Sequence, residues 1–296
     1  MEDAVRRAVR EAVGTAVAGL TVLAAEPARA VVRVTSAGQR TPLIVKVGRR
    51  SDVRGRGADF ATTAAATAMA AGAGVPTPEV LAARTAGACD EWGWLVQRSA
   101  DGSPWCALRA RLGEDEVRAV HRRLAEAVLA LQSVRTAGFG DLDAEGRTTD
   151  DDLPTALHAR VDRLVADPAD RAALHILLDR EPDLLDGAPP TLCHDDLHAE
   201  NVLLDQRDGQ WRITAVLDWD KAWAGPAESD VARLAFWDGM TGPGFWEVYR
   251  AAVPEPPGWP RRALLHQLLW CLEYDAPTQR HRTDTAAVRA ALLERG

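Results

Sequence analysis

The sequence predicts a two-lobed α+β protein, with a small N-terminal lobe built on strands and a larger, mainly helical lobe after it. Valine-rich, strand-like runs lie near the start of the chain, and apolar stripes at helical spacing fill its second half. Between them, the apolar run Trp94-Leu95-Val96 passes into a polar turn that ends at Gly102. We place the lobe boundary at this hinge, which divides the chain into residues 1–98 and 99–296.

In the N-terminal lobe, apolar residues at helical spacing predict a first helix over residues 1–17. Two strand-like runs follow, at residues 30–34 and 43–47, and the turn signal between them predicts a hairpin. Lys46 lies on the second strand of this hairpin, and it is one of very few lysines in a chain rich in arginine. A further helix is expected over residues 58–71.

In the C-terminal lobe, residues 114–135 carry the clearest helical stripe, which is typical of a core helix. The sequence Asp167-Pro168 resembles an N-cap followed by a proline in the first helical turn. Further helices are predicted near residues 156–164, 172–185, 229–237, 244–252, 261–274 and 283–294.

Composition narrows the classes of partner. The formal net charge of −8 argues against nucleic acid and favours a cationic small molecule, although enzymes with neutral substrates can be equally acidic. Charged residues interrupt every apolar run before it reaches membrane-spanning length, and the N-terminus has no apolar signal core. The four cysteines are scattered without a C-x-x-C pair. We therefore expect a cytoplasmic protein with reduced thiols and no membrane partner, either a monomer or a homodimer.

Two sequence blocks carry the chemistry. His194, Asp196 and Asn201 follow the spacing H-x-D-x-x-x-x-N of a kinase catalytic loop. A second strand-like run then ends in Asp218, so a hairpin would bring Asn201 and Asp218 together. Asp196 can accept a proton from a substrate hydroxyl, and the amide and carboxylate oxygens of the other two suit Mg²⁺. These blocks predict phosphoryl transfer from a nucleotide.

Other interpretations of the same residues exist. A chain this acidic contains many aspartates by chance, and Asp195-Asp196 alone could be a solvated turn. His194 and His198 could suggest zinc, but no cysteine or histidine partner lies at finger spacing. The order of the two blocks and the apolar runs around them favour the kinase interpretation.

The two blocks resemble those of the aminoglycoside phosphotransferase family, small-molecule kinases with a protein-kinase-like fold. That family shows H-G-D-L-H-x-x-N followed by I-D-W-x-x-A-x-x-G-P-x-x-D-L-A, and residues 217–232 match the second pattern closely. The resemblance extends weakly along nearly the whole chain. One departure is Asp195, where the family usually has glycine; aspartate tolerates unusual backbone angles better than most residues.

The resemblance implies a nucleotide-binding N-terminal lobe and a C-terminal lobe for catalysis and acceptor binding, with ATP or GTP as donor and Mg²⁺ as cofactor. It places Lys46 on the phosphates, and the Arg98 carbonyl and Ala100 amide on the adenine edge. The alternative for Lys46 is a surface lysine on an edge strand. No glycine-rich loop precedes it, and residues 58–71 lack the glutamate that pairs with this lysine in kinases. Thr62 or Thr63 stands at that position, so either Asp59 substitutes or the nucleotide and metal alone position the lysine.

Supporting and acceptor residues are also expected. Asp230 resembles the family's buried aspartate at a helix start, which holds the catalytic loop. His194 is expected to have a structural role near the metal-binding turn, whereas His198 could line the site, pack or catalyse. Tryptophan at helical spacing usually belongs to the core, and Asp220 could instead contact a metal or lie in a solvated turn. The candidate acceptor residues are Asp220, Trp223, Trp237, Trp270, Glu273 and Asp275, with Asp238 beside them.

Three functions remain open on the sequence. The first is a kinase for an antibiotic hydroxyl, in resistance or self-protection. The second is a kinase for a primary metabolite with a choline-, homoserine- or fructosamine-type acceptor group. The third is a nucleotide-binding pseudokinase, which the missing helix glutamate favours and the intact Asp196, Asn201 and Asp218 oppose.

Overall fold

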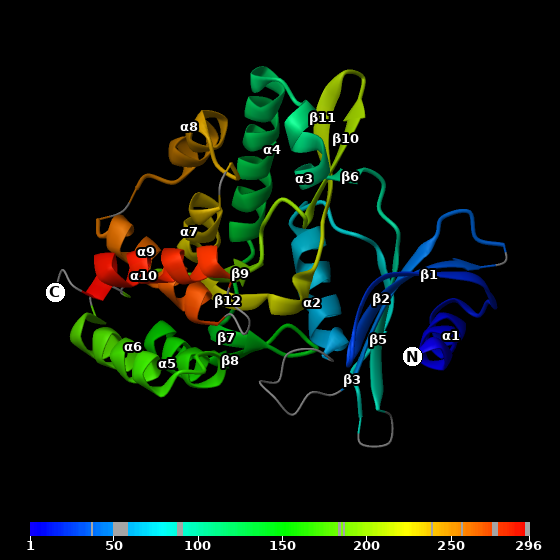
Figure 1. Cartoon of the computed structure of the whole chain (residues 1–296), viewed down its shortest axis with the longest axis horizontal. Coiled ribbons are helices and arrows are strands. Elements are labelled where there is room, and N and C mark those ends of the chain that lie inside the picture. Colours follow the sequence, from blue (N-terminus) through cyan, green and yellow to red (C-terminus); the bar gives the residue numbers. More distant parts are fainter. Residues whose placement is uncertain are drawn as a thin grey trace.

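A computed structural model describes residues 1–36, 38–49, 59–87, 91–182, 185, 187–237, 239–255, 257–273 and 278–293. Figure 1 shows two lobes. One contains the large sheet and helix α1, the other is mainly helical, and helix α2 lies between them. The predicted lobe boundary falls at the end of strand β5. Among the described residues, no helix is both long and apolar enough to cross a membrane.

The N-terminal lobe is an antiparallel sheet of five strands in the order β1-β2-β3-β5-β4. Its strands are β1 (Val17–Glu26), β2 (Arg29–Ser36), β3 (Leu43–Arg49), β4 (Val80–Arg84) and β5 (Trp92–Arg98). Lys46 lies opposite Val31 and Leu95 on the central strand β3, so the edge-strand alternative does not hold.

Two helices flank this sheet. Helix α1 (Glu2–Val13) packs its apolar side on the sheet face that carries Val45 and Val47. Because side chains alternate along a strand, Lys46 between them points to the other face. Helix α2 (Phe60–Gly72) is capped by Asp59, whose carboxylate accepts from the Thr62 amide. Its inner residues join the core of the second lobe, so α2 links the two lobes.

The chain enters the second lobe through a tight turn. Gly102 has φ +104°, and a Cβ there would lie 2.7 Å from the Leu204 carbonyl oxygen, so a side chain would collide with the neighbouring hairpin. That hairpin, β10 (Val202–Arg207) with β11 (Gln210–Val216), pairs with β6 (Ser103–Pro104) in a three-stranded sheet. A second sheet has four strands in the order β8-β7-β12-β9, and its strand β9 leads directly into residues 194–201. Its strands are β7 (Phe139–Leu142), β8 (Thr148–Asp150), β9 (Pro190–Cys193) and β12 (Trp223–Pro226).

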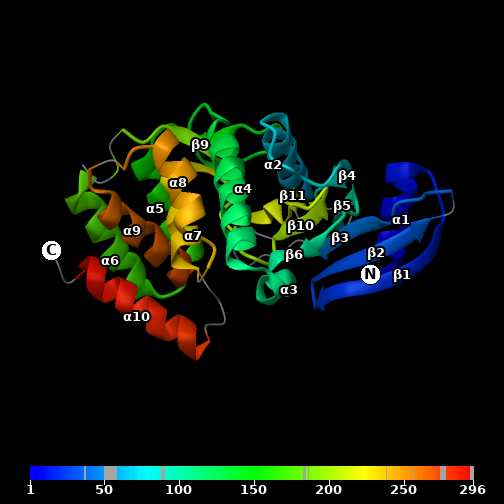
Figure 2. The same ribbon diagram turned by 90° about the horizontal axis from the view of Figure 1, so that it is seen from above.

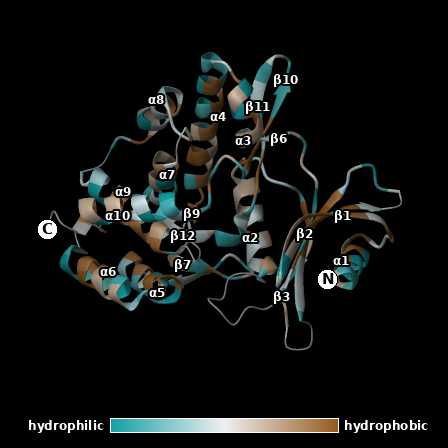
Figure 3. Ribbon diagram, viewed as in Figure 1, coloured by the Kyte–Doolittle hydropathy of each residue, from teal (hydrophilic) through white to brown (hydrophobic). Residues whose placement is uncertain are grey.

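Helices form the rest of the second lobe, with the long α4 at its centre (Figure 2). Figure 3 shows hydrophobic residues along the strands of the large sheet and on α4. The helices are α3 (Trp105–Leu108), α4 (Glu114–Gln132), α5 (Leu153–Leu164), α6 (Pro168–Arg180), α7 (Glu228–Phe236), α8 (Pro243–Ala252), α9 (Trp259–Leu272) and α10 (Gln279–Leu293), with short 3₁₀ turns η1 (Arg109–Arg111) and η3 (Trp219–Lys221).

The predicted helices are present, with shifted ends. Helix α6 begins at Pro168 and not at residue 172, because Asp167 caps it by accepting from the amides of Ala169 and Asp170. Helix α1 ends at Val13, where Gly14 adopts a left-handed conformation. Strand β1 was not predicted.

Candidate active site

The catalytic loop is fixed by one buried carboxylate and one buried imidazole. Asp230, in the first turn of α7, accepts hydrogen bonds of 2.8 Å from the amides of both His194 and Asp195. The His194 Nε2 atom lies 2.8 Å from the Leu217 carbonyl oxygen, and Nδ1 accepts from the Asp196 amide at 3.1 Å. Burial lowers the pKa of His194, which suits a neutral ring with one donor and one acceptor. The two residues fix the backbone that carries Asp196.

The Asp196 carboxylate lies 2.9 Å from the ammonium of Lys221. Burial alone would raise the pKa of Asp196, but the Lys221 charge and hydrogen bond outweigh it and the pKa is lowered. The carboxyl is therefore ionised at neutral pH, as a proton acceptor must be. Sequence reasoning missed Lys221, although one signal was there: the chain has only two lysines, and the other is Lys46.

The β10–β11 hairpin brings the two predicted metal ligands together. The amide of Leu217, next to Asp218, donates to the Asn201 carbonyl oxygen at 2.8 Å. Asn201 Nδ2 donates to the Asp196 carbonyl oxygen at 2.9 Å, and this bond leaves the Oδ1 atom able to bind a metal. Within the described residues no group of three His, Cys, Asp or Glu side chains could hold a metal. One amide oxygen and one carboxylate oxygen suit Mg²⁺, and phosphates and waters would complete its coordination.

Lys46 reaches this hairpin from the other lobe. Its Nζ atom lies 2.5 Å from an Asp218 oxygen and 3.0 Å from an Asp220 oxygen. Burial would lower the pKa of Lys46, but the carboxylates of Asp220 and Asp218 outweigh it and raise the pKa. These side chains and Arg29 line a hollow of about 200 Å³ beneath the β1–β2 turn. The hollow lies where the sequence predicts the nucleotide phosphates.

Asp220, a predicted acceptor contact, faces the N-terminal lobe. Its Oδ1 atom accepts from Thr63 Oγ1 at 3.1 Å, and its Oδ2 atom lies 2.5 Å from Arg29 Nη2. Thr63 is thus the α2 residue that meets the lysine cluster, whereas Thr62 Oγ1 is directed at the Leu142 carbonyl oxygen. The suggestion that Asp59 substitutes for the missing glutamate is not supported.

Asp59 has other partners. Its Oδ1 atom accepts from the Thr62 amide at 3.3 Å and from Thr85 Oγ1 at 2.7 Å. The residue therefore caps α2 and ties it to the end of β4.

Three of the predicted acceptor residues lie in a closed cluster behind the catalytic loop. Trp223 and Trp270 are buried, and they lie against the guanidinium groups of Arg160 and Arg233, with ring centroids at 4.5 and 5.9 Å. The Glu273 carboxylate is held by Arg160 through two hydrogen bonds of 2.6 and 2.8 Å. These side chains bind one another and present little surface to a substrate.

Asp195 completes this cluster. Its backbone is left-handed, with φ 65°, and its buried carboxylate pairs with Arg160 and lies 3.2 Å from Arg233 Nη1. Burial and the two arginines lower the pKa of the adjacent His266 to about 3, so that ring stays neutral. The aspartate at the family's glycine position is thus an ionic anchor for the catalytic loop. Sequence reasoning treated it only as a tolerated departure.

Trp237 is the half-buried aromatic near the catalytic loop. Its ring centroid lies 6.0 Å from that of His198 and 4.9 Å from that of Trp270. Asp275 and Asp238 lie outside the described residues. At the hinge, Arg98 and Ala100 line a hollow of about 460 Å³ with residues of β11, and their contact with adenine stays a prediction.

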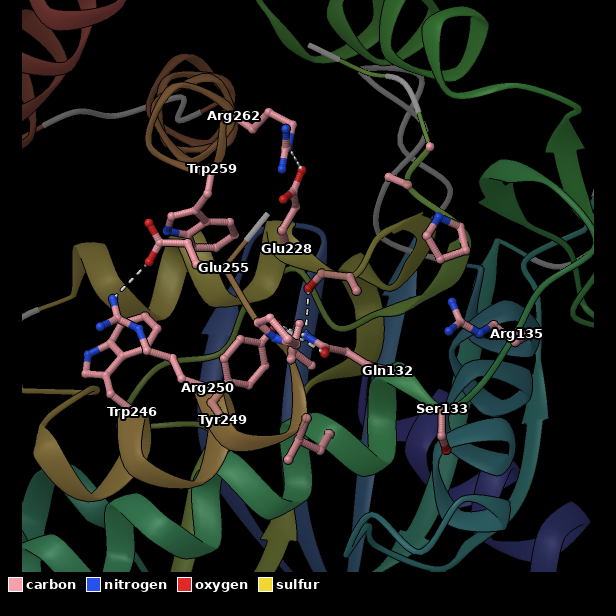
Figure 4. Close-up of a pocket in the computed structure, with 17 residues that line it drawn as sticks. Gln132, Ser133, Arg135, Glu228, Trp246, Tyr249, Arg250, Glu255, Trp259 and Arg262 are labelled. Carbon is pink, nitrogen blue, oxygen red and sulfur yellow. Dashed lines mark hydrogen bonds and ion pairs between the residues drawn. The ribbon is translucent and has the colours of Figure 1, made fainter. Parts of the chain in front are cut away.

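A separate hollow of about 480 Å³ lies between α4, α8 and α9, away from the catalytic loop. Figure 4 shows Trp246, Tyr249 and Trp259 around it, with two ion pairs among its charged residues. None of the lining residues belongs to the catalytic loop or to the lysine cluster.

The geometry agrees with a known family. The family model described as "phosphotransferase enzyme family" matches residues 21–265. The chain belongs to this family. Over 178 residues it is 31% identical to the hygromycin-B 4-O-kinase of Escherichia coli, a match that covers 56% of the chain and 49% of that enzyme. The chain therefore spans about half the length of this curated relative.

Solved structures share the fold of this chain. A ternary complex of a thermostable mutant of aminoglycoside phosphotransferase APH(4)-Ia with AMP-PNP and hygromycin B has a TM-score of 0.67 at 23% identity, covering 98% of each chain. A putative fructosamine-3-kinase from Haemophilus somnus 129PT has a TM-score of 0.65 at 15% identity, covering 99% of this chain and 98% of that one. These likenesses confirm the predicted α+β, protein-kinase-like fold.

Proposed function

We propose that this phosphotransferase is an ATP- or GTP-dependent kinase that phosphorylates a hydroxyl of a small-molecule antibiotic, with an aminoglycoside as the favoured acceptor. One observation carries the proposal. Four groups converge between the lobes: the ionised Asp196 carboxylate, one oxygen each from Asn201 and Asp218 that could bind a metal, and the Lys46 ammonium. Phosphoryl transfer requires these groups and little covalent chemistry from the protein.

The chain's residues act mainly by position and charge. Asp196 orients the acceptor hydroxyl and accepts its proton as the bond to phosphorus forms. Lys46 holds the phosphates from the N-terminal lobe, opposite the catalytic loop. Mg²⁺, held by Asn201 Oδ1 and Asp218, would neutralise the phosphate oxygens. Lys221 keeps Asp196 ionised and adds a second positive charge on the side where the acceptor would meet the phosphate.

The antibiotic acceptor is supported by two relatives. One is named for phosphorylating hygromycin B, and another was solved with hygromycin B bound. The half-buried Trp237 offers a ring face near His198 on which a sugar could stack. The likeness to a putative fructosamine-3-kinase favours a metabolite acceptor as the alternative, since that fold is shared at similar TM-score.

An acceptor screen tests the proposal. The purified chain is incubated with Mg²⁺ and ATP or GTP, and each acceptor is examined by mass spectrometry for one added phosphoryl group. The panel contains hygromycin B, other aminoglycosides, nucleoside and peptide antibiotics, choline, homoserine and a fructosamine. Modification of an antibiotic supports the proposal, and modification of choline, homoserine or the fructosamine alone supports the metabolite alternative.

The matched control is Asp196→Asn, which keeps the shape of the side chain but cannot accept the proton. Transfer should fall by about 10²–10⁴-fold, the usual contribution of a general base. Near-normal transfer by this variant would remove Asp196 from the mechanism. Nucleotide binding without transfer to any acceptor by the unaltered chain would favour the pseudokinase.

A further inference from the structure

The lysine on β3 has a carboxylate partner, but from an unexpected element. Kinases of this fold pair that lysine with a glutamate on the helix that follows it. Helix α2 carries no glutamate along its length, and Thr63 occupies the place where one would face the cleft. The carboxylate that meets Lys46 there belongs to Asp220, at 3.0 Å.

We propose that Asp220 is the positioning residue for Lys46 and replaces the helix glutamate of related kinases. The proposal rests on the proposed kinase function, and it assigns to Asp220 a role in orienting the phosphate-binding lysine. The anchor thus comes from the segment just after the metal ligand Asp218, and not from the N-terminal lobe.

Burial separates the two carboxylates beside the lysine. The Asp220 side chain is 14% exposed, close to the 12% of Lys46. The Asp218 side chain is 44% exposed, so it is open to a metal ion and its nucleotide. When a metal takes the Asp218 carboxylate, the ammonium keeps Asp220 as its partner.

Both carboxylate oxygens of Asp220 have side-chain partners in the structure. Thr63 and Lys46 both bind its Oδ1 atom, and Arg29 binds Oδ2. Both oxygens are therefore engaged within the protein, which disfavours a role as a substrate or second metal contact.

The backbone under Asp220 is also fixed. Asp218, the residue directly before the η3 turn, is left-handed with φ 66°. The buried Trp219 donates from Nε1 to the Val216 carbonyl oxygen at 2.9 Å. The same turn continues to Lys221, which pairs with Asp196. This turn and the residue before it thus supply a metal ligand, the anchor of one lysine and the other lysine itself.

The first test removes the charge and keeps the size. In Asp220→Asn, kcat should fall by about 10²-fold, the cost expected when a group in the site is misplaced by about 1 Å. KM for the acceptor should stay unchanged, whereas a substrate contact would raise it and overturn the proposal. Asp208→Asn, at the exposed β10–β11 turn, is the matched control and should leave both constants unchanged.

A second readout needs no turnover. Thermal unfolding of Lys46→Met, Asp220→Asn and the double variant forms a double-mutant cycle without nucleotide. If the two groups are coupled, the double variant loses less Tm than the sum of the single losses. Additive losses would show that Asp220 does not hold Lys46.

The sharpest test moves the carboxylate back to the helix. Because Thr63 Oγ1 and Lys46 Nζ both bind the same Asp220 oxygen, a glutamate at residue 63 can reach the lysine once Asp220 is shortened. Compared with Asp220→Ala alone, the added Thr63→Glu should raise Tm and should raise kcat at least about tenfold, because a charge-assisted hydrogen bond is regained. Thr62→Glu in that background, directed elsewhere, should restore neither.

The single variant Thr63→Glu sharpens the assignment. With Asp218 and Asp220 in place, it would set a third carboxylate beside the Lys46 ammonium, so both Tm and kcat should fall. A gain of activity in this variant would mean that the lysine lacks an anchor, and it would overturn the proposal. If no acceptor is ever phosphorylated, the kinase function fails, while the unfolding cycle and its rescue at residue 63 still decide the role of Asp220.

Discussion

Two clusters of like composition flank the catalytic loop, and they differ in their access to water. Behind the loop, Arg160 and Arg233 pair with Asp195 and Glu273, and none of these side chains is more than 8% exposed. In the cleft, Arg29 and Lys46 pair with Asp218 and Asp220, where exposure reaches 44%. Each cluster balances two cations against two carboxylates.

The difference in burial assigns different tasks to the two clusters. Buried charges that lose a partner cannot be rescued by water, so the closed cluster is fixed and holds the loop in one place. In the cleft, phosphates and Mg²⁺ can replace carboxylates and cations as partners, so the pairs there are exchangeable. Two cations and two carboxylates can either hold a loop in place or exchange partners with a ligand, and the burial of the four side chains decides between these roles.

The largest expected effect breaks the closed cluster. Arg160→Met removes the cation that hydrogen-bonds both Asp195 and Glu273 and leaves Arg233 alone to balance two buried carboxylates. The loss should cost about 3–5 kcal/mol of unfolding free energy in urea denaturation. Arg163→Met, on the same helix, is the control, since its pair with Asp141 is partly exposed and worth about 0–1 kcal/mol. Equal losses in the two variants would erase the distinction between closed and open clusters.

The next effect concerns the open cluster and the metal. Asp218→Ala should lower Mg²⁺-dependent transfer by about 10²-fold or more, because residues that merely support a metal ligand are worth about 10–100-fold. Its unfolding free energy should change little. Asn201→Ala should lose less, since it removes a neutral dipole and not a charge. Unchanged Mg²⁺ dependence in Asp218→Ala would show that the metal binds elsewhere.

Removing the cleft lysine should have a somewhat smaller effect. In Lys46→Ala, ATP should bind less tightly by on the order of 1.5–3 kcal/mol, the value of a charge-assisted hydrogen bond. Adenosine, which has no phosphates, should bind as before. Calorimetry with both ligands separates the roles, because a lysine that only supports the fold predicts equal losses for the two.

The smallest effect is one of pH. Lys221 lowers the pKa of Asp196 against the opposing effect of burial. Lys221→Met removes the largest of the effects that oppose burial, so the pKa of Asp196 rises and the base protonates at higher pH as the solution is acidified. The fall of kcat/KM at acidic pH should therefore begin at a higher pH, while kcat/KM near neutral pH stays unchanged. An unmoved fall at acidic pH would show that Asp196 does not set it.

The sequence alone was informative where partners are near in the chain. Asp196, Asn201 and Asp218 could be placed together because a short hairpin connects them, and Lys46 stood out on a valine-rich strand. The pairs Lys46–Asp220 and Arg160–Glu273 join residues that are 174 and 113 positions apart. Their meeting depends on how whole lobes and helices pack, and no local pattern records that.

Residue type also left ambiguities that only packing resolves. Trp223 and Trp270 suited sugar stacking as well as core positions, and the structure sets both against buried arginines. Strand β1 escaped prediction because its side chains are mostly exposed, so it shows no clean alternation of apolar and polar residues.

The scarcity of lysine in this chain makes the candidate active site chemically distinct. Lys46 and Lys221 are its only side-chain amines, and each lies beside an aspartate of the site. Apart from the α-amine, amine-selective reagents can therefore react only at these two positions, which a single tryptic peptide map can tell apart. Bound nucleotide should shield Lys46 from such reagents and a bound acceptor should shield Lys221, so labelling of the unaltered protein can follow the occupancy of each half of the site separately.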